Sequence, residues 1–407
     1  MKLNRFLAFT LAFLSLHVTT YAQQNSNIKT FYFTSNSHSY TPFLKQGETA
    51  HFRFDDLDAD QKDFYYRITH MTYDWEPSAL KPSEYIKGYQ SDRIRNFENS
   101  TNTLQFYTHY KFQLPNQNTQ ITRTGNYLIE ILDDYDQVVA NRRISIYQPQ
   151  AAVALSVHKS RQIQNQQTHQ NLEFSISYQN LRSNEPNQDF KIALLQNGDW
   201  NNAIFNIRPQ YISKNTLIYK YSTETNFYGS NEFLHFDSKY LRTANDQINT
   251  VLSGNDVYQT ILYPDEVRAG KIYTYNPDIN GGFEIRMNNN PKPQTSADYT
   301  EVEFSLRSKA VFPNNIYVYG GFNNYQLLDE NKLVYDQKSQ TYKVSMRLKQ
   351  GFYNYKYLAT AMQSNPISGD FYQTENQYQV LVYFQTYGNR YYEIIGFGEA
   401  DSEQLRQ

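Results

Sequence analysis

The sequence contains no cysteine among its 407 residues, and this absence excludes several kinds of site. No disulfide can connect two parts of the chain, and no zinc site built from thiolates can form. A lipoprotein anchor needs a cysteine at the mature N-terminus, where we expect Gln23 instead. Each domain must therefore be stable without covalent cross-links, which the length of the chain allows because each domain can bury its own core.

An excess of charge of one sign is also missing. The chain has 38 Lys and Arg against 40 Asp and Glu, a formal net charge of -2. A nucleic-acid-binding protein needs a basic face that displaces counterions from phosphates, so we expect no nucleic-acid partner. Beyond the first residues no apolar run approaches the roughly 20 residues of a spanning helix, and we expect no direct insertion into a membrane.

Motifs that carry catalysis are absent as well. There is no Gly-x-Ser-x-Gly turn and no glycine-rich phosphate loop followed by lysine. No two histidines have the spacing of a metal-binding pair, and His70 and His109 lie among aromatic residues in expected strands, which favours a structural role. The sequence neither predicts nor excludes a glycosidase pair of carboxylates, because such pairs form from distant segments. We predict no enzyme, no metal, no cofactor and no small-molecule substrate.

One acidic segment, Asp55-Asp56-Leu57-Asp58-Ala59-Asp60, resembles part of a calcium loop. The glycine of the sharp turn and the glutamate at the twelfth position are both missing. We interpret the segment instead as an acidic turn after a strand at residues 51–54, because aspartate side chains bond their own backbone there.

The N-terminus has the three parts of a secretory signal peptide. Lys2 and Arg5 give a positive start, residues 6–16 are mainly apolar, and Thr20 and Ala22 are small residues at the positions that a signal peptidase reads. The apolar run is too short for a membrane anchor. We predict a signal peptide at residues 1–22 and export to the periplasm.

The composition favours β-structure, with 38 Tyr and 26 Phe. Residues 172–178 and 302–306 alternate between apolar and polar side chains, as half-buried strands do. Between Pro77 and Pro82, and on to residue 86, there is room for only a short helix. We predict an all-β protein of tandem β-sandwich domains, immunoglobulin-like or fibronectin-like, with little helix.

Two polar breaks divide the chain. One is Gln148-Pro149-Gln150, and the other is the Asn- and Pro-rich stretch at 288–297. After the signal peptide at 1–22 we predict an N-terminal β-sandwich at 23–149, a central β domain at 150–290 and an immunoglobulin-like sandwich at 291–407, each of the usual sandwich size.

Three motifs place an aromatic residue in or beside an expected turn: Asp74-Trp75-Glu76-Pro77-Ser78, Gln196-Asn197-Gly198-Asp199-Trp200-Asn201-Asn202 and Gly320-Gly321-Phe322-Asn323-Asn324-Tyr325. The first interpretation is structural: Asn and Gly adopt unusual backbone angles, and the aromatic ring covers the end of a sandwich. The alternative is a partner surface, because exposed Trp and Tyr are preferred interface anchors. We therefore keep Trp75, Trp200 and Tyr325 as candidate partner-binding residues.

Motifs along the whole mature chain resemble the plug protein family of the Bacteroidetes type IX secretion system. Besides the Trp75 and Trp200 motifs, the matching segments are Phe54-Asp55-Asp56-Leu57, Asn102-Thr103-Leu104, Tyr107-Thr108-His109-Tyr110, Leu114-Pro115-Asn116, Gly125-Asn126-Tyr127-Leu128, Arg142-Arg143, Asn231-Glu232-Phe233, Asp278-Ile279-Asn280-Gly281, Leu348-Lys349-Gln350-Gly351-Phe352-Tyr353-Asn354-Tyr355 and Thr374-Glu375-Asn376. The resemblance implies a non-catalytic periplasmic protein of β domains that closes the periplasmic mouth of a giant outer-membrane β-barrel translocon, held at the membrane by that protein partner.

The last third of the chain also resembles immunoglobulin-like glycogen-binding modules, through Gly321-Phe322-Asn323-Asn324-Tyr325 and Leu348-Lys349-Gln350-Gly351-Phe352-Tyr353-Asn354-Tyr355-Lys356-Tyr357. Those modules have Trp where this chain has Tyr325, and a further Trp that is missing here, so the resemblance concerns the fold more than carbohydrate binding. Two alternative functions therefore remain: a periplasmic glycan-binding protein, and a secretion accessory factor that binds cargo.

Overall fold

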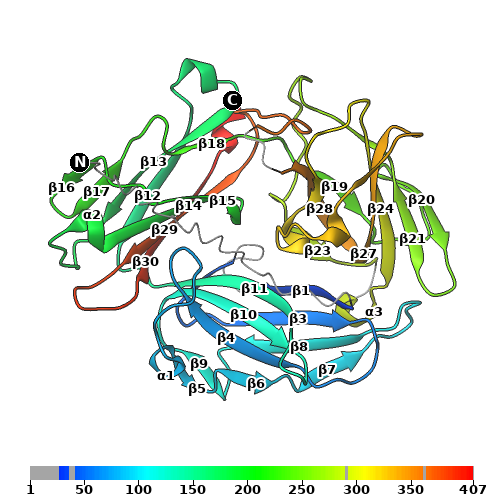
Figure 1. The fold of residues 1–407 in the computed structure, drawn as a ribbon, viewed down its shortest axis with the longest axis horizontal. Coiled ribbons are helices and arrows are strands. Elements are labelled where there is room, and N and C mark those ends of the chain that lie inside the picture. The colour runs from blue at the N-terminus through cyan, green and yellow to red at the C-terminus, as the bar shows by residue number, and fades with distance from the viewer. Residues whose placement is uncertain (1–26, 36–41, 289–291, 361–363, 407) are drawn as a thin grey trace, which may run out of the picture.

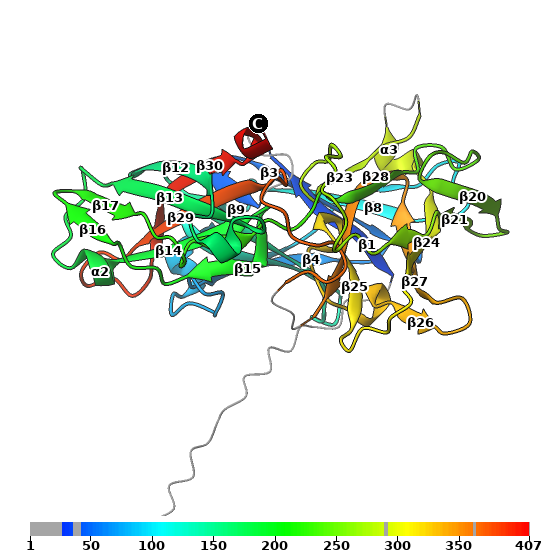
Figure 2. The same ribbon diagram turned by 90° about the horizontal axis from the view of Figure 1, so that it is seen from above.

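The structure is a computed structural model that describes residues 27–35, 42–288, 292–360 and 364–406. The predicted signal peptide at residues 1–22 lies outside these ranges. The described chain is almost entirely β-structure arranged as three sandwiches, which confirms the predicted fold class. Figure 1 shows the three sandwiches as lobes around a common centre, and Figure 2 shows the same body from above.

The first domain is a sandwich of two antiparallel-rich sheets. One sheet has the order β1-β3-β8-β7, formed by β1 (Ile28–Thr34), β3 (Ala50–Asp56), β8 (Thr108–Leu114) and β7 (Asn96–Asn99). The other has the order β2-β11-β10-β4-β6, formed by β2 (Phe43–Lys45), β11 (Val138–Tyr147), β10 (Gly125–Leu132), β4 (Tyr65–Met71) and β6 (Ser91–Arg93). A short ladder joins β5 (Ile86–Gly88) to β9 (Thr119–Ile121). The helix α1 (Pro82–Tyr85) is a single turn within the predicted helical region.

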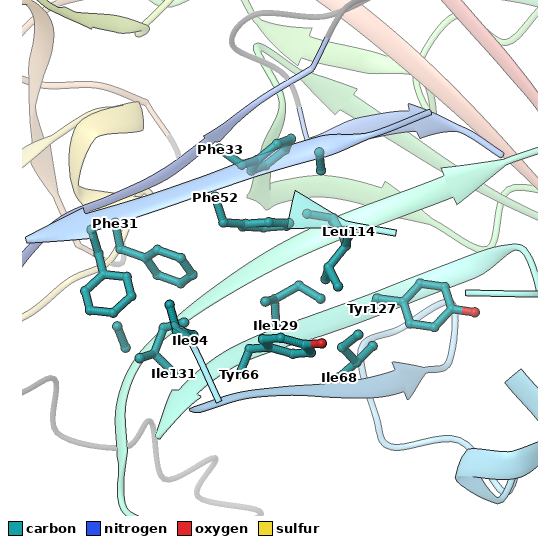
Figure 3. Packing of buried hydrophobic residues seen from close by; sticks show 14 of the residues in the cluster. Phe31, Phe33, Phe52, Tyr66, Ile68, Ile94, Leu114, Tyr127, Ile129 and Ile131 are labelled. Carbon is teal, nitrogen blue, oxygen red and sulfur yellow. The ribbon is translucent and has the colours of Figure 1, made fainter. Parts of the chain in front are cut away.

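The core of the first domain lies between these two sheets (Figure 3). Phe31 and Phe33 of β1 face inward because alternate residues of a strand share one face. Opposite them, Tyr66 and Ile68 of β4 and Ile129 of β10 are all 2% exposed or less. Alternation of aromatic and polar residues therefore produces the hydrophobic core that a domain without disulfides requires.

The second domain is built from two distant segments of the chain. The first supplies β12 (Ala152–Lys159), β13 (His169–Ser177), β14 (Phe190–Gln196), β15 (Asp199–Phe205), β16 (Tyr211–Ser213), β17 (Thr216–Tyr219) and β18 (Asn226–Tyr228), with α2 (Pro186–Asp189). The second supplies β29 (Gln377–Phe384) and β30 (Glu393–Asp401), and β14 pairs with β29 to complete the sheet β15-β14-β29-β30. The facing sheet contains β12, β13, β17, β16 and β18.

The third domain is inserted between these two segments. Its strands are β19 (Leu234–Asp237), β20 (Ile248–Ser253), β21 (Tyr258–Leu262), β22 (Asp265–Glu266), β23 (Phe283–Ile285), β24 (Tyr299–Arg307), β25 (Ile316–Tyr319), β26 (Val334–Asp336), β27 (Thr341–Lys349) and β28 (Gly351–Ala359), with α3 (Pro293–Ser296). Strands β19, β23 and β25 all pair with β28. The other sheet has the order β20-β21-β24-β27-β26, and β22 also pairs with β24. The predicted boundary at 290/291 is therefore wrong, because it falls inside this domain, and the C-terminal strands belong to the second sandwich.

The two segments that connect the second and third domains are bonded to each other. The hydroxyl of Thr374 donates to the carbonyl of Ser230 at 2.9 Å, and the amide of Asn231 donates to the carbonyl of Ser368 at 2.8 Å. The backbone N–H of Glu375 donates to the carboxylate of Glu232 at 3.1 Å. Two crossing segments bonded in this way restrict rotation of one domain against the other.

The first domain contacts both of the others through buried side chains. Toward the second domain it adds Phe43 to a hydrophobic cluster with Leu381 and Tyr383, and the Tyr383 hydroxyl donates to Asn126 Oδ1 at 3.0 Å. Toward the third domain, Asp55 of β3 lies 2.6 Å from Lys349 Nζ of β27, and both side chains are 1% exposed. Each domain is thus fixed to the other two. No helix in the described part of the chain has the length and hydrophobicity that a membrane span requires.

Candidate functional site

A cavity of about 990 Å³ lies where the three domains meet. The first domain contributes residues of β1 and β11, the second contributes the turn before β15, and the third contributes residues 279–285 and the loop after β25. Figure 1 shows β1, β15 and β23 on the inner sides of their lobes. We take this three-domain cavity as the candidate functional site.

Three turns around the cavity have left-handed backbone conformations. Asn197 and Gly198 have φ of 57° and 69°, and Asn280 and Gly281 have φ of 51° and 83°. In the third turn Asn324 and its neighbour both have φ of 54°. Asparagine and glycine tolerate these angles best, which confirms the prediction for the motifs at 196–202 and 320–325. The motifs lie far apart in the sequence, and the fold brings them to one cavity.

Tyr325 is one of the predicted partner-binding residues, and it joins the second and third domains. Its hydroxyl donates to the carbonyl of Asn197 at 3.2 Å, and its own carbonyl accepts from the Asn201 amide at 2.8 Å. Its ring lies 5.1 Å from that of Tyr319. The hydroxyl also fills the space beside Gly281, where a Cβ would come within 2.6 Å of it. Tyr325 is therefore half-buried in the wall of the cavity.

The other two candidates, Trp75 and Trp200, contact each other across the first and second domains. Their ring centroids are 4.9 Å apart in an edge-to-face arrangement. The Arg143 guanidinium lies 4.7 Å from the Trp75 ring, a cation–π distance. Trp75 has φ of 67°, which is rare for a bulky residue. Trp200 lines the cavity and Trp75 lies behind it, so both belong to an interdomain contact.

Charged groups in the cavity wall are largely removed from water. Burial raises the pKa of Asp199 to about 6, although the hydroxyl of Tyr319 donates to its carboxylate at 2.5 Å. Burial lowers the pKa of Arg142 to about 10. Among the described residues, the hydrogen bonds of the Arg142 guanidinium are two long ones, of 3.4 and 3.5 Å, to the carbonyl of Gly321. The wall thus holds a cation whose surroundings compensate its charge poorly.

A smaller cavity of about 340 Å³ adjoins the first and shares Arg142 and Phe283 with it. It extends along β1 at Lys29, Thr30 and Phe31. Arg142 lies where the two cavities meet, so a ligand that enters either space reaches the same guanidinium.

The acidic segment at 55–60 forms the predicted turn after a strand, but two residues later than expected, because Asp55 and Asp56 are buried and belong to β3. The Asp56 carboxylate accepts from the backbone N–H of Asp58 at 3.2 Å, as expected of an aspartate that bonds its own backbone. Lys62 Nζ lies 3.0 Å from Asp56 and 3.5 Å from Asp60, and it also contacts Asp58. Within the described ranges no group of three His, Asp or Glu is placed to hold a metal ion.

The two aromatic-flanked histidines lie in strands as predicted. His109 Nδ1 is 2.6 Å from Asp55 Oδ1, which places the ring in the contact between the first and third domains. His70 Nε2 lies 3.5 Å from the carbonyl of Thr124 in the first domain. Both rings are buried and have structural partners.

Glu232, in the connection between the second and third domains, provides a pH prediction. Burial raises its pKa to about 7. Because the folded pKa exceeds the unfolded value, its contribution to stability is complete below about pH 4 and is lost as the pH rises through 7. We expect the free energy of unfolding of Glu232→Gln to depend less on pH than that of the parent. At pH 8 the variant should be more stable than the parent by about 2 kcal/mol. Urea unfolding at pH 4.5 and 8 measures this.

The exposed Glu185 provides the control for that measurement. Glu185→Gln should leave the difference in stability between the two pH values unchanged. If Glu232→Gln shows the same pH dependence as the parent, the protonation of Glu232 does not contribute to it.

Sequence reasoning missed two features of the site. The sequence identifies Arg142 only as part of the family motif Arg142-Arg143, and its lack of a nearby carboxylate follows from the fold. The strand β23 is only three residues long, and its alternation is too short to detect. The adjacent Gly281-Gly282 pair was the only local sign of close backbone packing.

The comparisons with known proteins agree with the fold. Residues 28–148 match the family model of the type 9 secretion system plug protein 1st domain. A crystal structure of a hypothetical protein from Parabacteroides merdae is 29% identical, covers 93% of this chain and 98% of that chain, and has a TM-score of 0.89. The partial N-terminal region of enterococcal surface protein, 9% identical over 98% of this chain and 97% of that chain, has a TM-score of 0.19, too low to indicate a shared fold. No curated protein matches.

The matched range coincides with the whole first sandwich, from the start of β1 to the end of β11. This sandwich supplies Arg142 and the floor of the cavity, as well as the buried contacts to both other domains. The motif resemblance of the full sequence and the match of a complete structural domain lead to the same family. The first domain of this chain therefore matches the first domain of the type 9 secretion system plug protein family.

Proposed function

We propose that this protein is a periplasmic plug that binds the outer-membrane β-barrel translocon of the type IX secretion system and closes its periplasmic opening. The match of residues 28–148 to the plug family carries this proposal. This match itself supports a role in type IX secretion, a periplasmic location and a protein partner in that system. The family and the all-β fold also favour a non-catalytic role.

The rigidity of the three-domain body supports the proposal. Very large barrels cannot fill their lumen with side chains, and the largest known single-chain barrels have about 36 strands. A sandwich of about 125 residues is about 35 Å across, so three joined sandwiches can cover an opening wider than one domain. Contacts such as Asp55–Lys349 and Tyr383–Asn126 keep the domains from separating under load.

Site-specific crosslinking tests whether the protein binds the barrel and which of its surfaces makes the contact. Since the natural chain has no cysteine, a single introduced cysteine is the only thiol for a photo-crosslinker. Suitable exposed positions are Tyr135 in the first domain, Tyr211 in the second and Val334 in the third. We expect at least one labelled variant to crosslink to the barrel in native envelopes. If all three purify as free monomers or crosslink only to secreted cargo, the plug proposal is wrong, and cargo would indicate the accessory-factor alternative.

The glycan-binding alternative receives no support from Tyr325. A stacking platform for a sugar needs an accessible ring face, whereas this ring packs on Tyr319 and its hydroxyl is bonded to the second domain. We therefore keep the protein-binding proposal as the main one.

A further inference from the structure

The edge of β23 faces the three-domain cavity. Every residue from Ile279 to Ile285 lines the cavity. Successive side chains of a strand point to opposite faces, so a cavity that is lined by all residues of a strand must lie along its edge. In the described part of the chain, β23 pairs with β28 on one side and with no strand on the other.

The hydrogen-bond pattern shows which backbone groups face the cavity. The carbonyl of Gly282 accepts from the N–H of Asn354 at 3.0 Å, and the N–H of Arg286 donates to the carbonyl of Gln350 at 3.2 Å. Alternate residues of an antiparallel strand bond the same neighbour. The intervening residues Phe283 and Ile285 therefore direct their N–H and C=O groups toward the cavity, where another extended chain can bond them.

Two arginines flank this open edge. Arg142 bonds the carbonyl of Gly321, whose N–H donates to the carbonyl of Gly281 at 2.8 Å, directly before β23. On the other side, the Arg53 guanidinium lies 6.0 Å from the Tyr32 ring, which is 5.6 Å from the Phe283 ring.

Neither arginine has a carboxylate of the described residues within ion-pair distance. Other arginines of the described chain form ion pairs, such as Arg67 with Glu130 and Arg347 with Glu301, whereas Arg53 and Arg142 form none. The Arg53 guanidinium donates instead to the Thr34 hydroxyl at 3.0 Å. A buried guanidinium without a counter-charge is unfavourable, so a ligand carboxylate placed beside Arg142 would be stabilised. The carboxylates of Asp199, Glu284 and Glu399 also line the cavity, so Arg142 is the place in the wall where we expect an anionic group.

We propose that the three-domain cavity binds an extended acidic segment of another protein, which adds a strand to the open edge of β23 and places a carboxylate on Arg142. In such strand addition, main-chain hydrogen bonds give affinity, and alternate side chains give specificity. The volume of about 990 Å³ lies at the upper end of ligand pockets, as a peptide requires. A small anion would use the arginine and leave Phe283 and Ile285 unpaired. This inference does not depend on the translocon being the partner.

The first test is isothermal titration calorimetry of the full mature protein with a capped heptapeptide of alternating Val and Glu. We expect the peptide to bind and its Val/Lys counterpart to bind at least tenfold more weakly. Arg142→Gln should weaken binding of the Val/Glu peptide by about tenfold, because a charge-assisted hydrogen bond is lost. Arg67→Gln, which changes an arginine that Glu130 already neutralises, should leave binding unchanged. Equal binding of the two peptides, or no effect of Arg142→Gln, would overturn the proposal.

The second test locates the peptide without any substitution in the protein. Hydrogen–deuterium exchange should show protection of residues 279–286 when the peptide is present. N-methylation of those peptide residues that face β23 should abolish binding, whereas N-methylation of the alternate residues should not. Protection confined to other segments would overturn the proposal. So would glutarate binding as tightly as the peptide, which would show a site for free carboxylates, or self-association that blocks the peptide, which would show a second copy as the occupant.

Discussion

Lys349→Met is expected to destabilise the protein by about 3–5 kcal/mol, because it removes the lysine partner of the buried Asp55 carboxylate. Lys349 Nζ lies 2.6 Å from Asp55 Oδ2, and neither side chain exceeds 1% exposure. The Tyr299 hydroxyl also donates to Asp55 Oδ2, at 2.6 Å, and His109 bonds the other oxygen. Because these groups come from the first and third domains, the loss should also loosen the two domains from each other. Calorimetry and urea unfolding measure it.

Two further variants separate this effect from a general loss of a charge. The double variant Asp55→Asn with Lys349→Met removes both charges and should recover most of the stability. Lys111→Met breaks the exposed pair with Glu98 and should cost less than about 1 kcal/mol. If the double variant is as unstable as Lys349→Met alone, the buried charge is not the cause.

The same pair has a pH signature. Burial alone would raise the pKa of Asp55, but Lys349 and His109 outweigh burial and hold the pKa below its ordinary value. A lowered folded pKa contributes stability above about pH 4 that is lost as the pH falls further. The parent should therefore lose more stability below pH 4 than Asp55→Asn does.

A chain that ends at residue 370 is expected not to form the second domain. It would lack β29 and β30, so β14 would lose its partner in the middle of the sheet. The core of that domain would lose the buried side chains of Tyr378, Val380, Val382, Phe384 and Ile395. Each such loss costs about 2–5 kcal/mol, and together they exceed the roughly 5–15 kcal/mol that stabilises a domain.

A chain that ends at residue 402 is the matched control. It lacks only residues 403–407, which include the 3₁₀ turn Glu403–Arg406, and keeps Ser402, whose hydroxyl donates to the carbonyl of Thr374 at 2.8 Å. We expect it to fold. Limited proteolysis and circular dichroism distinguish the two chains. A stable, protease-resistant second domain in the chain that ends at 370 would contradict the discontinuous architecture.

The local pattern of the sequence predicted individual strands well. Leu172, Phe174 and Ile176 alternate with polar residues, and all three are buried in β13. The Asn- and Gly-containing motifs were correctly expected to adopt unusual backbone angles. These features depend on neighbouring residues only, which is why sequence reasoning finds them.

Long-range pairing was not predictable in the same way. A period of two shows which face of β14 is buried, but not that its partner β29 lies almost 190 residues later. The Asn- and Pro-rich stretch at 288–297 predicts a domain boundary, yet the strands on either side of it, β23 and β24, both belong to the third sandwich. The cavity arises only from this topology, so Arg142 and the edge of β23 could not be placed together from the sequence.

The only two tryptophans of the chain, Trp75 and Trp200, form one pair at the junction of the first and second domains. Intrinsic tryptophan fluorescence therefore reports a single interface and is silent about the three hydrophobic cores. Its emission should shift as soon as this junction opens, even while far-ultraviolet circular dichroism still shows intact sheets. If tryptophan emission changes at a lower denaturant concentration than circular dichroism, the first and second domains separate before their sheets unfold. Tryptophan emission therefore measures the separation of the first and second domains without any added label.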